Sequence, residues 1–343
     1  MDIKGYTYGY NSGKGAYTTP AALRSRELLL ETGVNWVCLA FSVRQKTFAS
    51  TEILYDYARN VSDLEIISTV DEFHAQGIRV CLKPMIDVED GNWRALINFP
   101  DTNQFGQDPY WDKWFAAYRA FLLHYAEIAA YCGCEMFCLG CEMLGTERKE
   151  QHWRDTIAAV RRVYNGELVY NTNHGKEEVA KWYDCIDYIG TSAYYPVAPT
   201  PANAAEFNRA PGEDFVPAGP VPAATDVEYM RSEWKKIAEQ LDGVSKRTGK
   251  PIIFMEIGCR SAAGCASMPW DFTHRAFPFS EEEQANFYES SISVMSDYPW
   301  FKGYFWWDWS TVVYDDRESA LKDTGFNIHL KKAEEVIKKW YKR

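Results

Sequence analysis

The chain has 343 residues, of which 46% are hydrophobic and 25% are charged, as expected of a soluble globular protein. Its 37 basic and 48 acidic residues give a formal net charge of -11, which argues against nucleic acid as a partner because nucleic-acid binding draws on Lys and Arg. No apolar run reaches the length of a membrane span, so we expect no membrane contact. The N-terminus lacks the pattern of a signal peptide, and an odd number of cysteines favours reduced thiols; we therefore expect a cytoplasmic protein.

Short apolar or β-branched runs alternate with longer amphipathic ones, a pattern typical of β/α units and a parallel sheet. The predicted strands are 3–9, 35–41, 78–83, 135–140, 167–171, 187–193, 251–255 and 301–307. The predicted helices are 20–31, 62–76, 109–131, 151–164, 177–182, 226–247, 281–296 and 329–341. Pro20 in a first turn and the capping box that starts at Ser62 mark two of the helix starts.

Eight strands, each followed by a helix, predict one closed (β/α)₈ barrel over residues 1–343, a single domain. In this fold the active site lies at the carboxyl ends of the strands. Several loops that follow strands are long, and the Pro/Ala-rich stretch from Pro196 to Pro222 is the longest. Long loops at one face of a rigid barrel are where substrates usually bind.

Two glutamates stand at the ends of apolar strands. Glu142 follows Phe137-Cys138-Leu139-Gly140-Cys141, and Glu256 follows Ile252-Ile253-Phe254-Met255. The fourth and seventh strands end across the barrel from each other, so the pair fits glycoside hydrolysis, which needs an acid at the leaving oxygen and a carboxylate at the anomeric carbon. The alternative is a pair of salt-bridged or solvated surface glutamates.

Four strings, taken in their order and spacing, resemble glycoside hydrolase family 113 over nearly the whole chain. They are Lys83-Pro84-Met85-Ile86-Asp87, Asn92-Trp93-Arg94, Phe137 to Glu142, and Glu256-Ile257-Gly258-Cys259-Arg260-Ser261. The family consists mainly of β-1,4-mannan-degrading enzymes in a clan of barrel glycosidases that retain anomeric configuration. The resemblance implies that Glu142 is the general acid/base and Glu256 the nucleophile.

Two cysteines depart from the pattern of the family. Cys141 stands where many members of the clan carry Asn and this family often Thr, and Cys259 stands where an aromatic residue is expected. An Asn before the acid could contact the sugar 2-hydroxyl, so the resemblance does not carry that contact over to Cys141.

Further residues near predicted strand ends are candidates for substrate binding. Tyr194 or Tyr195 could donate a hydrogen bond to Glu256, Trp306 could form the floor under the sugar, and Lys83 or Arg260 could bind hydroxyls or hold a carboxylate. Asn171, Asn173 and His174 could line the site, and Trp93 and Arg94 could form a sugar platform. The alternatives are core packing for the aromatic residues, structural ion pairs for the cations, and turn or capping roles for Asn and His.

The sequence favours an enzyme without metal or cofactor. Cys132, Cys134, Cys138 and Cys141 are close in sequence, but Cys138 and Cys141 lie at odd separation on one predicted strand and should point to opposite faces, so we interpret the four as packing residues. His residues are not placed at strand ends as a ligand set.

We therefore predict a monomeric or weakly oligomeric retaining glycoside hydrolase that acts on an oligosaccharide or polysaccharide, β-1,4-mannan or manno-oligosaccharides by the resemblance. Exo-action would follow if the 196–222 loop closes one end of the cleft. Two alternatives stay open: the same chemistry on another neutral glycan such as glucan or xylan, and a catalytically silent sugar-binding barrel.

Overall fold

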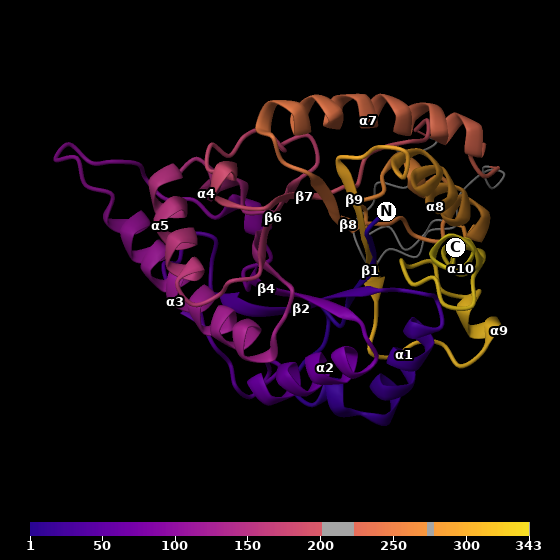
Figure 1. Ribbon diagram of the computed structural model, residues 1–343, viewed down its shortest axis with the longest axis horizontal. Coiled ribbons are helices and arrows are strands. Elements are labelled where there is room, and N and C mark those ends of the chain that lie inside the picture. The colour runs from indigo at the N-terminus through magenta and orange to yellow at the C-terminus, as the bar shows by residue number, and fades with distance from the viewer. Residues whose placement is uncertain (201–222, 273–277, 343) are drawn as a thin grey trace.

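The computed structural model describes residues 1–200, 223–272 and 278–342, and in them eight parallel strands close into a barrel (Figure 1). The barrel strands are β1 (Ile3–Tyr8), β2 (Trp36–Gln45), β4 (Arg79–Val88), β5 (Met136–Cys141), β6 (Glu167–Asn173), β7 (Tyr188–Ser192), β8 (Ile252–Ile257) and β9 (Phe301–Trp309). Each strand pairs in parallel with the next, and β1 pairs with both β2 and β9, which closes the ring. The two-residue strand β3 (Ile53–Leu54) pairs antiparallel with the end of β2 and is no part of the ring.

Helices surround the barrel and cover its outer surface (Figure 1). They are α1 (Pro20–Leu30), α2 (Asp63–Ala75), α3 (Pro109–Cys132), α4 (Leu144–Glu147), α5 (Glu150–Arg161), α7 (Val227–Thr248), α8 (Glu281–Met295), α9 (Arg317–Ala320) and α10 (Lys332–Tyr341). Several of them start at a capping side chain: Ser62 accepts a hydrogen bond from the Glu65 N–H in a full capping box, and Asp226 accepts from two N–H groups at the start of α7.

Apolar side chains fill two regions on either side of the strands. A smaller buried cluster lies inside the barrel, and a larger one lies between the strands and the helices. The inner cluster consists of Ile3, Trp36, Cys38, Cys81, Met136, Cys138, Val169, Ile253, Met255 and Phe305. Because residues alternate along each strand, most strands supply side chains to both regions. Side chains therefore fill the interior of the barrel, and the active site is expected at its mouth, where the strands end.

The structure confirms the predicted barrel and its strand order, and it corrects three details. Residues 177–182 form turns before a short 3₁₀ helix at Tyr183–Cys185 rather than the predicted helix. Cys138 and Cys141 both point into the barrel instead of to opposite faces, because the register of β5 on β6 shifts between them. The sequence also gave no sign of the four-residue helix α4.

Part of the 196–222 loop, residues 201–222, lies outside the described residues. In the described ranges, no helix combines the length and the apolarity that a membrane crossing requires.

Candidate active site

Glu142 and Glu256 lie at the mouth of the barrel. Glu142 directly follows β5, the fourth strand of the ring. Glu256 is the last residue but one of β8, the seventh strand. Their surroundings are shared, because Cys141, the neighbour of Glu142, approaches the Glu256 carboxylate. The backbone at Glu142 has a φ of 53°, a left-handed conformation that residues other than glycine rarely adopt. Its N–H donates to the Asn171 carbonyl over 2.7 Å.

The Glu256 carboxylate is held from several sides. Its Oε1 accepts from Lys83 Nζ at 2.5 Å, the Cys141 thiol at 3.2 Å and Asn171 Nδ2 at 3.3 Å. Its Oε2 accepts from the Tyr194 hydroxyl at 3.3 Å. Lys83 is fully buried, and a buried ion pair with additional hydrogen bonds fixes the carboxylate in position.

The donors around Glu256 are in the protonation states that this arrangement needs. Burial by itself lowers the pKa of Lys83, but the acidic groups around it, the Glu256 carboxylate among them, outweigh burial and leave the pKa above its ordinary value, so the ammonium stays charged. Burial and the charge of Glu256 raise the pKa of the Cys141 thiol, which therefore keeps its proton and donates it to the carboxylate. Burial likewise raises the pKa of Tyr194.

Glu142 has a different environment. Trp93 Nε1 donates to its Oε2 at 3.2 Å and Asn173 Nδ2 donates to its Oε1 at 3.1 Å, while Arg94 stands 3.7 Å from Oε2. Burial raises the pKa of the Glu142 carboxyl, the charge of Glu256 raises it further, and Arg94 opposes the rise. A carboxyl with a raised pKa can hold its proton at higher pH and act as a general acid.

Arg94 is anchored beside Glu142 by groups that sequence reasoning did not place in the site. Its guanidinium donates to Asp87 Oδ1 at 2.5 Å, to the Tyr10 hydroxyl at 2.9 Å and, through Nε, to the Ile86 carbonyl at 3.0 Å. The Asp87 carboxylate also accepts from Tyr10. Asp87 ends the string Lys83-Pro84-Met85-Ile86-Asp87 at the third predicted strand, which was the available signal, whereas Tyr10 lies in a loop with no such signal.

Two predicted site residues point away from the mouth. Trp306 is fully buried between Tyr288 and Tyr304, with ring centroids 3.9 and 4.7 Å away, and its Nε1 donates to the Tyr341 hydroxyl. The prediction that Trp306 forms the sugar floor is therefore wrong. The neighbouring Trp307 faces the other side and contacts the Tyr10 ring at 4.9 Å.

Tyr195 is the second. Its hydroxyl donates to Glu177, and its ring packs against Trp234 and Phe254 outside the barrel. Since adjacent residues face opposite ways, the strand end can present only one of the two tyrosines to Glu256, and that one is Tyr194.

His174 and Arg260 lie in loops near the mouth with partners of their own. The His174 ring stacks on Trp270 with centroids 5.7 Å apart, and burial lowers the pKa of His174. Arg260 pairs with Asp271 at 3.5 Å. The prediction that they bind sugar stays a prediction, as it does for Lys83, Trp93, Arg94 and Asn173, which contact the two glutamates.

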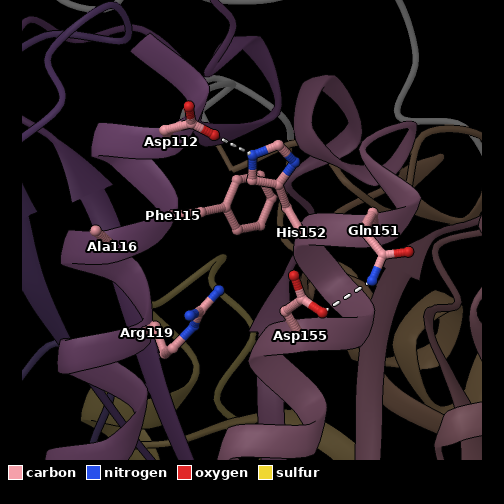
Figure 2. A pocket seen from close by; sticks show the side chains of 7 residues that line it. All are labelled: Asp112, Phe115, Ala116, Arg119, Gln151, His152 and Asp155. Carbon is pink, nitrogen blue, oxygen red and sulfur yellow. Dashed lines mark hydrogen bonds and ion pairs between the residues drawn. The ribbon is translucent and has the colours of Figure 1, made fainter. Parts of the chain in front are cut away.

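Outside the mouth, the barrel surface carries a hollow of about 390 Å³ between α3 and α5 (Figure 2). Four of its polar side chains form two pairs, His152 with Asp112 at 2.9 Å and Gln151 with Asp155 at 2.8 Å. In the described ranges, no three His, Cys, Asp or Glu side chains gather as metal ligands would.

A (β/α)₈ barrel with glutamates at the ends of its fourth and seventh strands, one in an environment that favours its proton and one beside a buried cation, defines a barrel glycoside hydrolase. The chain belongs to glycoside hydrolase family 113, whose family model matches residues 6–331.

Solved structures agree with this assignment. A family 113 β-mannanase from Alicyclobacillus acidocaldarius, in complex with ManMIm, is 37% identical with a TM-score of 0.84, over 99% of this chain and 97% of that one. A second structure, of a family 113 β-1,4-mannanase, is 34% identical with a TM-score of 0.84, over 100% of this chain and 99% of that one.

A β-glucuronidase from Ruminococcus gnavus is similar in fold alone, at 15% identity and a TM-score of 0.58, over 99% of this chain and 50% of that one. Comparison with curated protein sequences found no match.

Proposed function

We propose that the protein hydrolyses β-1,4-mannosidic bonds in mannan or manno-oligosaccharides with retention of anomeric configuration. One observation carries the mechanism: two glutamates at the same mouth have opposite environments. Glu142 is largely buried beside a negative charge, which raises its pKa and favours the protonated acid. Glu256 forms a buried ion pair with the Lys83 ammonium at 2.5 Å, which holds its carboxylate in place.

The first step forms a glycosyl ester. An oxygen of Glu256 attacks the anomeric carbon, the bond from that carbon to the leaving oxygen breaks, and the proton of Glu142 moves to the leaving oxygen. In the second step Glu142, now a carboxylate, takes a proton from water as the water oxygen attacks the anomeric carbon. The ester bond breaks, Glu256 regains its charge, and the proton is back on Glu142.

The donors on Glu256 indicate which of its oxygens attacks. Lys83, Cys141 and Asn171 all donate to Oε1, whereas among the described residues only Tyr194 donates to Oε2. An oxygen with three donors is stabilised as an anion and is a weaker nucleophile. We therefore assign the attack to Oε2, with Oε1 held in place by its three donors.

The choice of mannose as the sugar is supported by the relatives. The two similar structures at 37% and 34% identity are named as β-mannanases, and their coverage spans the entire barrel. Retention is supported by membership of family 113, which belongs to a clan of barrel glycosidases that retain anomeric configuration.

Product analysis tests the substrate. Mannohexaose, cellohexaose and xylohexaose are incubated separately with the protein, and the products are separated by chromatography. Release of mannose or short manno-oligosaccharides from mannohexaose alone supports the proposal, and the product sizes distinguish exo- from endo-action. Cleavage of cellohexaose or xylohexaose instead would overturn the sugar assignment. Absence of turnover on all three would favour the silent sugar-binding barrel.

A further inference from the structure

A hydrogen-bonded chain of buried residues lies behind Glu142, on the outer face of the barrel strands. Tyr170 of β6 is fully buried, and its hydroxyl accepts from the Met143 N–H at 3.2 Å. The same hydroxyl donates to Glu147 Oε1 at 2.9 Å. Met143 directly follows Glu142, so this chain reaches the peptide that carries the acid without contacting its carboxyl group.

The peptide that joins Glu142 to Met143 needs a contact that fixes its orientation. With φ of 53°, Glu142 is in a left-handed conformation that costs a non-glycine residue about 1 kcal/mol or more, and it persists only where neighbouring contacts fix it. On one side the Glu142 N–H donates to the Asn171 carbonyl at 2.7 Å. On the other side the fixed point is the Tyr170 hydroxyl.

The phenol is itself held by rigid packing. The Tyr170 ring meets the edges of Trp153 and Trp182, with centroids 5.2 and 5.0 Å away, and these two indoles stack on each other at 4.7 Å. Trp153 Nε1 donates to the Thr146 carbonyl and Trp182 Nε1 to the Glu147 carbonyl, each at 3.1 Å. The backbone of α4 and the phenol are thus parts of one packed unit.

Glu147 fixes the direction of the phenol O–H. A hydroxyl hydrogen rotates to suit its surroundings, and an acceptor at 2.9 Å turns it toward Glu147, which leaves a lone pair facing Met143. Thr172 donates to the same Oε1 at 3.0 Å. Glu147 Oε2 is buried and finds no hydrogen-bond partner among the described residues, a costly placement for a carboxyl that only fills space.

We propose that Tyr170 and Glu147 are positioning residues that set the direction of the Glu142 carboxyl by fixing the peptide after it. The inference rests on the proposed role of Glu142 as acid/base. It predicts a selective defect: loss of the Tyr170 hydroxyl misplaces the acid, so bonds whose leaving group needs a proton break more slowly. Bonds to a leaving group that departs as a stable anion need no proton and are spared.

The test compares two substrates in one preparation of the Tyr170→Phe variant. Mannohexaose has a leaving group that needs protonation, and 2,4-dinitrophenyl β-mannoside has one that does not. We expect kcat/KM on mannohexaose to fall by about 10- to 100-fold and kcat/KM on the aryl mannoside to change by less than about 3-fold. The ratio of the two values does not depend on the folded fraction, so partial unfolding cannot imitate the result.

Thr172→Val is the matched control, because it removes the other donor to Glu147 Oε1 without touching Met143. We expect its ratio to stay at the wild-type value, and Glu147→Leu to move the ratio in the direction of Tyr170→Phe. An equal fall on both substrates in Tyr170→Phe, or an unchanged ratio, would overturn the positioning role. If the wild-type protein cleaves the aryl mannoside but not mannohexaose, the proposed action on mannan is overturned instead. Any oligosaccharide that the wild-type protein does cleave then replaces mannohexaose in the comparison.

Discussion

At the scale of single residues, Glu256 is the group whose loss the chemistry cannot replace. Glu256→Ala removes the atom that forms the glycosyl ester and leaves Lys83 without its partner at 2.5 Å. We expect kcat on mannohexaose to fall by about 10⁴-fold or more. Circular dichroism and gel filtration establish that the variant is folded. Turnover close to that of the wild type in the folded variant would refute the nucleophile assignment.

Arg94 is the residue that tunes the acid. The first step needs Glu142 protonated, so activity is lost as the pH rises through the Glu142 pKa. Burial raises that pKa and Arg94 lowers it, so removing the guanidinium should raise the pKa. In Arg94→Met we expect the basic limb of the kcat/KM–pH profile to move to higher pH.

Arg44→Met is the control for this shift. Arg44 also faces Asp87, at 3.8 Å, but it is not among the groups that act on Glu142. We expect its basic limb to stay in place. A limb that moves down in Arg94→Met, or that moves equally in both variants, would show that Glu142 is not the group that sets it.

At the scale of elements, the repeated pattern of apolar strands could be predicted from the sequence, whereas an irregularity within one strand could not. Apolar runs and capping residues placed all eight barrel strands, and the strand-end rule placed Glu142 and Glu256 at the mouth. Alternation along a strand tells which side chains point into the barrel only if the strand keeps its register with its neighbours. β5 shifts register after Cys138, so Cys141 turns inward against Glu256, and that thiol contact could not be read from spacing.

The errors at Trp306 and Tyr195 have a different physical origin. Alternation established that one of each adjacent pair faces the mouth, but nothing in either residue type says which. Tertiary contacts from distant segments decide which residue faces outward. Tyr288 and Tyr341 contact the Trp306 indole, and Glu177 accepts a hydrogen bond from the Tyr195 hydroxyl. Tyr10 and Asp87, which anchor Arg94, were missed because their role exists only through the fold.

Helix α4 is an element whose geometry depends on one glycine. A Cβ built on Gly145 would lie 2.2 Å from the Ile97 carbonyl oxygen, and neither backbone has room to move freely. Gly145→Ala should therefore displace α4, lower the free energy of unfolding by about 1–3 kcal/mol and reduce kcat/KM, because α4 begins two residues after Glu142.

Gly243→Ala is the matched comparison in another helix. A Cβ there meets only the flexible end of Arg247, and alanine favours a helix over glycine by about 1 kcal/mol. We expect this variant to be as stable as the wild type or more stable in urea unfolding, with unchanged activity. Equal losses in both variants would contradict the assigned clash at Gly145.

At the scale of the whole molecule, buried carboxyl groups make the stability of the barrel depend on pH. Burial raises the pKa of Glu147 to about 7, whereas an unfolded chain gives a glutamate its ordinary pKa of about 4.5. Between these two values the folded state binds more protons than the unfolded state, so the free energy of unfolding falls as the pH rises. The sign is opposite to that of a salt-bridged carboxylate with a lowered pKa.

The contribution of Glu147 is fully present below about pH 4.5 and is lost as the pH rises through about 7, a change of up to about 3 kcal/mol. We therefore expect urea unfolding of the wild type to give a smaller free energy at pH 8 than at pH 5, and Glu147→Gln, which carries no titrating proton, to reduce that difference. The exposed Glu335→Gln is the control and should keep the wild-type dependence. If Glu147→Gln shows the same pH dependence as the wild type, the buried carboxyl does not hold a proton in the folded state, and the phenol of Tyr170 donates to a charged Glu147 throughout the working range.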